Sequence, residues 1–134
     1  MPNTKCKIFL TLTGLAFIYI GCNAFYDPIQ ALAGLDLGVD TVNARNELLA
    51  NYGGLHIGIG LFFIIGATRN NFRTPALVFL TLLTLGLSAG RIVSIVVDGW
   101  PSALNNFLLG LELYTAMLAA LFLYFESCNK KGYA

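Results

Sequence analysis

Four apolar runs, each about the length of a membrane-spanning helix, divide this chain almost completely. They cover residues 8–25, 48–67, 76–97 and 103–125. A helix of about 20 residues crosses the roughly 30 Å hydrocarbon core of a bilayer, where every backbone polar group has to be satisfied within the protein. The sequence therefore predicts an all-α integral membrane protein, a four-helix bundle of up-down-up-down order that forms one domain over residues 1–134.

The composition agrees with lipid as the solvent. Hydrophobic residues make up 57% of the chain and charged residues 11%, against about 25% charged in a typical soluble domain. The net charge of +1 and the scattered cations give no basic face for nucleic acid. Cys6, Cys22 and Cys128 contain no C-x-x-C pair, so we interpret them as free thiols and predict no metal and no cofactor.

The cations predict the orientation, because Lys and Arg beside helix ends stay on the cytoplasmic side. With four spans, one side collects Lys5, Lys7, Arg69, Arg73, Lys130 and Lys131, whereas the other has Arg45 with Asp27, Asp36, Asp40, Glu47 and Asp98. Both termini are therefore expected in the cytoplasm. The first run could instead be a signal peptide that ends at an acylated Cys22, but Tyr19 fits that pattern poorly.

Three ionisable residues lie inside the predicted spans, where a charge is costly and needs a partner. His56, Arg91 and Glu112 are each about 10 to 15 Å below the outer surface if a helix rises 1.5 Å per residue. Polar residues at helical spacing extend this layer on each span, namely Glu47, Asn51 and Tyr52 on the second, Ser94 and Asp98 on the third, and Asn105 on the fourth. We expect the three polar faces to converge in a wedge between the last three spans.

Within this wedge we expect Arg91 to pair with Glu112, the one carboxylate at its depth. Such a pair can bind a ligand or simply fix the helix register. His56 can equally be a packing histidine, and Asp98 can be the cap of an Asp-Gly turn. Two small-residue pairs, Gly54 with Gly58 and Gly86 with Gly90, predict close packing of the second and third spans.

Several of these residues carry a family resemblance. The segments 46–54 (NELLANYGG) and 98–102 (DGWPS), the pair Gly90 and Arg91 with Ser94, and Glu112 together resemble domain of unknown function 4345, a family of small bacterial four-helix membrane proteins. The resemblance extends over nearly the whole chain and implies the bacterial inner membrane, but it implies no established activity. Leu49 departs from the pattern, in which an arginine is usual at that position.

Three functions remain open from the sequence. The first is binding of a small amphipathic or lipid-like ligand, with candidate residues Glu47, Asn51, Tyr52, His56, Arg91, Ser94, Asp98 and Glu112. The second is a small membrane enzyme in which Glu112 or Asp98 donates a proton to an isoprenoid-like substrate, although no catalytic residue can be assigned. The third is an accessory subunit in a homo-oligomer or a larger membrane complex.

Overall fold

The computed structural model describes residues 2–35, 38 and 40–131, with side chains from residue 4 to residue 126 of these ranges. Its elements are α1 (Pro2–Tyr26), α2 (Pro28–Leu32), the 3-10 turn η1 (Ala33–Leu35), α3 (Val42–Leu48), the π-helical segment η2 (Leu49–Gly54), α4 (Leu55–Thr68), α5 (Asn70–Asp98) and α6 (Ala103–Lys131). The described residues include no strand, so the predicted all-α fold is confirmed. Asp36 and the side chains of Cys128, Lys130 and Lys131 lie outside the described part.

Four helical stretches are long and apolar enough to cross a membrane: Thr4–Tyr26, Val42–Thr68, Asn70–Asp98 and Ala103–Glu126. They correspond to the four predicted spans, and the chain is a multi-pass membrane protein. The second stretch is continuous because α3, η2 and α4 follow one another without a break.

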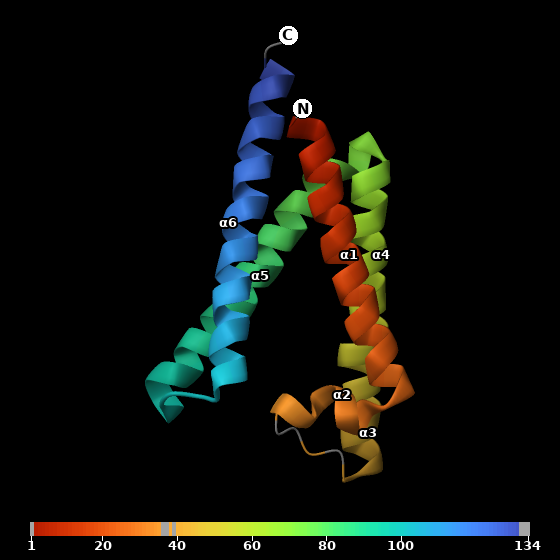
Figure 1. Ribbon diagram of the computed structural model, residues 1–134, viewed down its shortest axis with the longest axis vertical. Helices are drawn as coiled ribbons and strands as arrows, with labels where there is room; N and C mark the ends of the chain where they lie inside the picture. Colours follow the sequence, from red (N-terminus) through yellow and green to blue (C-terminus); the bar gives the residue numbers. More distant parts are fainter. Residues whose placement is uncertain (1, 36–37, 39, 132–134) are drawn as a thin grey trace.

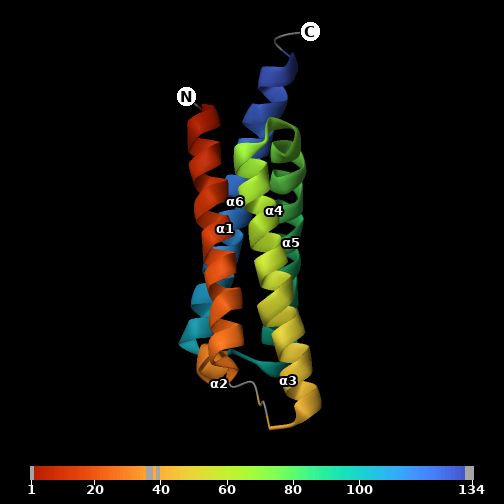
Figure 2. The same cartoon turned by 90° about the vertical axis from the view of Figure 1, so that its right-hand side faces the viewer.

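The four spans form two helix pairs, α1 with α4 and α5 with α6, which meet at one end of the molecule and separate toward the other (Figure 1). Both chain termini lie at the closed end, which we call the terminal end (Figures 1 and 2). The opposite end, called the loop end, contains α2, η1 and the α5–α6 turn. The buried core belongs to the closed part and includes Leu10, Phe63, Leu77, Leu80 and Ala119.

Glycines allow α1 and α4 to pack closely. A Cβ atom added at Gly60 would lie 2.6 Å from the carbonyl oxygen of Gly14, and one added at Gly21 would lie 2.7 Å from that of Gly53. These distances are too short for any side chain, so the two backbones meet directly at these positions.

The glycine pairs singled out from the sequence have a different place, and the prediction that they bring the second and third spans together is wrong. A Cβ atom at Gly58, Gly86 or Gly90 would meet nothing within 4 Å, and at Gly54 the nearest atom is 4.0 Å away, on the chain's own Leu49. These glycines line open space because α5 diverges from α4 toward the loop end (Figure 1).

Two predicted helix boundaries also need correction. The third span begins at Asn70 rather than at residue 76, and it contains Pro75. A proline removes one backbone hydrogen bond to the residue four positions earlier, here Asn71 near the helix start, so the helix continues through it. The second span begins at Val42, because Thr41 caps it by accepting a hydrogen bond from the Ala44 amide at 3.1 Å.

The long connection after α1 is more ordered than expected from its glycines. The Asp27 side chain caps α2 by accepting a hydrogen bond from the Gln30 amide at 3.0 Å, and Pro28 occupies the first helical position. The η1 turn reaches α6, since a Cβ atom at Gly34 would lie 2.7 Å from Leu104. At the loop end this segment therefore bridges the two helix pairs.

Candidate functional site

The predicted pair of Arg91 and Glu112 is present and links α5 to α6. The Nε–H group of Arg91 donates to both carboxylate oxygens of Glu112, at 2.9 and 3.0 Å. The Nη1 group donates to the Asn105 side-chain oxygen at 3.1 Å. The Arg91 side chain is 27% exposed and that of Glu112 is 12% exposed, so the pair lies at the rim of the helix interface.

Beside this ion pair lies a small cavity of about 230 Å³, which we call the polar niche. It is lined by Gly90, Arg91, Ser94, Ile95, Pro101 and Asn105. The Ser94 hydroxyl donates to Asp98 at 3.1 Å, which connects that exposed carboxylate to the niche. The turn that follows is closed by Gly99, whose φ of 95° favours glycine and whose amide donates to the Ile95 carbonyl at 3.1 Å.

His56 does not join this cluster. Its ring stacks on Phe17 of α1 at 5.4 Å and on Tyr52 at 5.5 Å, so its ring contacts are with the first helix pair. Its Nδ1 atom is 2.7 Å from the Asn51 carbonyl, which can only accept, so Nδ1 carries the proton. The contacts favour a packing role for His56, and the expected convergence of three polar faces in one wedge is not supported.

Glu47 and Asn51 also lie away from Arg91. The Asn51 amide donates to the backbone carbonyl of Glu47 at 2.9 Å and to its carboxylate at 3.2 Å, and both side chains are exposed. These bonds lie at the π-helical segment η2, which the sequence analysis treated as ordinary helix. A π segment shifts the register of the side chains that follow, which turns His56 toward α1.

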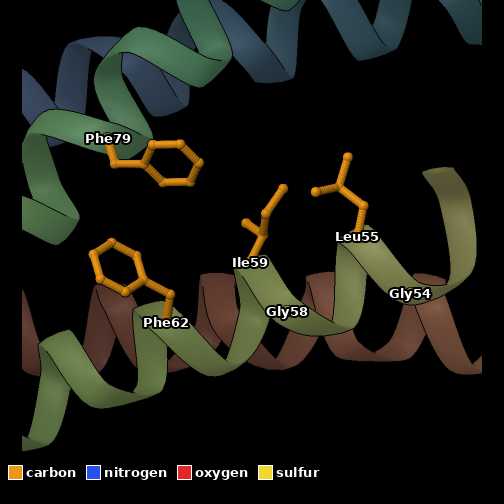
Figure 3. Close-up of a pocket in the computed structure, with 6 residues that line it drawn as sticks. All are labelled: Gly54, Leu55, Gly58, Ile59, Phe62 and Phe79. Carbon is orange, nitrogen blue, oxygen red and sulfur yellow. The ribbon is translucent and has the colours of Figure 1, made fainter. Parts of the chain in front are cut away.

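An apolar hollow lies between α4 and α5. It has a volume of about 590 Å³ and is lined by Gly54, Leu55, Gly58, Ile59, Phe62 and Phe79. We call it the apolar groove. In Figure 3, the rings of Phe62 and Phe79 close one end, and Leu55 and Ile59 project from α4 toward the open space. The two rings contact each other edge to face at 5.8 Å.

The apolar groove and the polar niche both lie along α5. Phe79 lines the groove and Gly90 lines the niche, and these residues are eleven positions apart, or about three helical turns. Gly86 lies between them on the same face and meets no neighbour. At 1.5 Å per residue, Phe79 and Gly90 are about 16 Å apart along α5.

A second ion pair, at the terminal end, was missed by the sequence analysis. Arg73 is only 1% exposed, although we predicted a loop cation at this position. Its Nη1 atom is 3.6 Å from a carboxylate oxygen of Glu126, and its Nη2 group donates to Asn70 at 2.7 Å. If α5 is extended past Pro75, the antiparallel helices that bring Arg91 next to Glu112 also bring Arg73 close to Glu126. This correspondence could have indicated the second pair.

Comparison with known proteins gives one match. The model of the family described as domain of unknown function (DUF4345) matches residues 6–123, which is most of the chain. The chain belongs to the DUF4345 family. No curated protein and no solved structure shows a significant match. The match contains every residue of the apolar groove and the polar niche.

The groups that line the two hollows of this DUF4345 protein offer hydrogen bonds and apolar contact. Within the described residues, no three His, Cys, Asp or Glu side chains come close enough to hold a metal ion. The niche offers guanidinium, hydroxyl and amide groups, and the surface of the groove is almost entirely carbon.

Proposed function

We propose that this DUF4345 protein binds a small amphipathic, lipid-like molecule that enters sideways from the bilayer. The observation that carries the proposal is that an apolar groove and a polar niche lie about three helical turns apart along α5. Ligand pockets typically have about 300–1,000 Å³ and few polar groups. The groove, at about 590 Å³, has room for an acyl or isoprenoid chain, and the niche supplies polar contacts.

The proposed location is the bacterial inner membrane, with both termini in the cytoplasm. Lys5, Lys7 and Arg69 are exposed at the terminal end, which supports the orientation by the positive-inside rule. Arg73 no longer contributes, because it is buried against Glu126. With this orientation, the groove opens toward the outer leaflet.

The enzyme alternative has less support. Glu112, the candidate acid, accepts two hydrogen bonds from Arg91 and so acts as the partner of a guanidinium rather than as a proton donor. The accessory-subunit alternative is favoured by the exposed Gly110 on α6, where another helix could approach closely. Cross-linking in native membranes that yields one dominant partner would support that alternative.

Ligand binding can be tested with a variant whose side chain fills the groove. A Cβ atom at Gly58 meets nothing within 4 Å, so Gly58→Leu places its side chain in the groove without a backbone clash. We expect the purified wild-type protein to retain an amphiphile that native mass spectrometry detects. Gly58→Leu should retain it at least about tenfold less, which corresponds to about 1.4 kcal/mol of lost binding energy.

Gly110→Leu is the matched control, because Gly110 is equally unobstructed but lies on α6, outside the groove. It should retain the wild-type amount, since lipids that merely surround the protein do not depend on the groove. Equal retention by wild type and Gly58→Leu, or no retained species in either protein, would contradict the proposed function.

A further inference from the structure

The two hollows suit different parts of the expected ligand. The polar niche, at about 230 Å³, is smaller than the roughly 300–1,000 Å³ of a complete ligand site, so it suits a head group only. The apolar groove has almost no polar surface and suits a chain. The charges around the niche therefore decide which head groups it accepts.

The niche is not a simple anion site. Arg91 is the one cation among the residues that line the niche, and Glu112 already pairs with that charge. Arg91 still has a donor to offer, because its Nη2 group has no protein partner among the described residues and its side chain is 27% exposed. A phosphate or carboxylate can thus accept a hydrogen bond from Arg91, but Arg91 and Glu112 together attract it little.

A negative charge lies close to the niche, about one turn of α5 beyond Ser94. Asp98 is exposed, and Ser94, which lines the niche, holds its carboxylate at 3.1 Å. The described loop end has one more cation, Arg45, but three more acidic residues, namely Asp27, Asp40 and Glu47. A purely anionic head group would therefore be attracted by Arg91 but repelled by the acidic residues of the same surface.

We propose that the niche binds a zwitterionic head group, an anionic group hydrogen-bonded to Arg91 and an ammonium group facing Asp98. The inference rests on the proposed function and names its ligand class. Both charges of such a head group meet an opposite charge of the protein, whereas an anionic head group meets Asp98 as a like charge. The exposed position of Asp98 limits the effect to that of a partly solvated charge pair.

The test uses delipidated wild-type protein in detergent and two probes with identical acyl chains, phosphatidylethanolamine and phosphatidylglycerol. Native mass spectrometry should show a preference of about fivefold for the zwitterionic phosphatidylethanolamine, as expected for one partly exposed charge pair. Asp98→Asn should abolish this preference. Glu112→Gln, which frees the Arg91 charge, should shift it toward phosphatidylglycerol.

Asp40→Asn is the control, because it removes an exposed acid from the same end of the molecule outside the niche. It should keep the wild-type preference. Asp98 is exposed, so Asp98→Asn keeps the test decisive even when Glu112→Gln fails to fold. If both lipids bind equally to wild type but Gly58→Leu binds neither, the head-group assignment is overturned and the proposed function stands. If Gly58→Leu binds both as wild type does, the function itself fails.

Discussion

Replacing Gly60 by alanine should destabilise this protein strongly, although it adds a single methyl group. The new Cβ atom would lie 2.6 Å from the Gly14 carbonyl oxygen and 3.0 Å from the Ile18 amide nitrogen. Both neighbours are backbone atoms of α1, so they can move only if the two helices separate. We expect the free energy of unfolding to fall by about 3 kcal/mol, the upper part of the range for overpacked sites.

Gly58→Ala is the matched control, on the same helix and two residues away. Its Cβ atom meets nothing within 4 Å, and alanine favours helix over glycine by up to about 1 kcal/mol, so stability should be unchanged or slightly raised. Thermal unfolding in detergent measures both variants. Equal melting temperatures for Gly60→Ala and Gly58→Ala would show that α1 and α4 do not touch at Gly60.

This contrast also shows what the sequence could predict. Apolar runs of membrane-spanning length are a local property, so four spans could be read from the chain, and each has its helix in the structure. Which glycines lie at contacts depends on which helices become neighbours, and this is a tertiary property. The small-xxx-small spacing of Gly54 and Gly58 resembles that of contact glycines, yet α5 leaves them exposed.

The candidate site, like the fold, was predictable only in part. Arg91 and Glu112 were paired correctly, because hydrocarbon penalises a lone charge and the tight 98–102 turn makes α5 and α6 antiparallel neighbours. His56 does not join Arg91 and Glu112. The direction of its side chain depends on η2, whose π-helical turn changes the face on which the side chain lies. The niche and the groove could not be predicted, because they exist only where the two helix pairs diverge, and the sequence pattern does not indicate this divergence.

The ion pair at the terminal end predicts a large loss of stability for a single substitution, most of which a second substitution restores. Arg73 is 1% exposed, and Glu126→Leu leaves its guanidinium with the Asn70 side chain as its remaining hydrogen-bond partner among the described residues. Breaking a buried pair by removing one partner costs about 3–5 kcal/mol. We expect about 3 kcal/mol of lost stability, because the Glu126 side chain is 20% exposed and so partly solvated.

The double variant Arg73→Met with Glu126→Leu should regain most of this lost stability, because it contains no uncompensated charge. It also removes the buried Arg73 Nε group, which lacks a hydrogen-bond partner in the described structure. Arg69→Met controls for loss of a cation at the same end, and its exposed side chain should change stability by less than about 1 kcal/mol. Unfolding measurements on Arg73→Met, Glu126→Leu and the double variant give the coupling energy between the two side chains. A double variant as unstable as the sum of its single changes would mean that Arg73 and Glu126 do not stabilise each other, and that apolar packing in the core holds α5 and α6 together at this end.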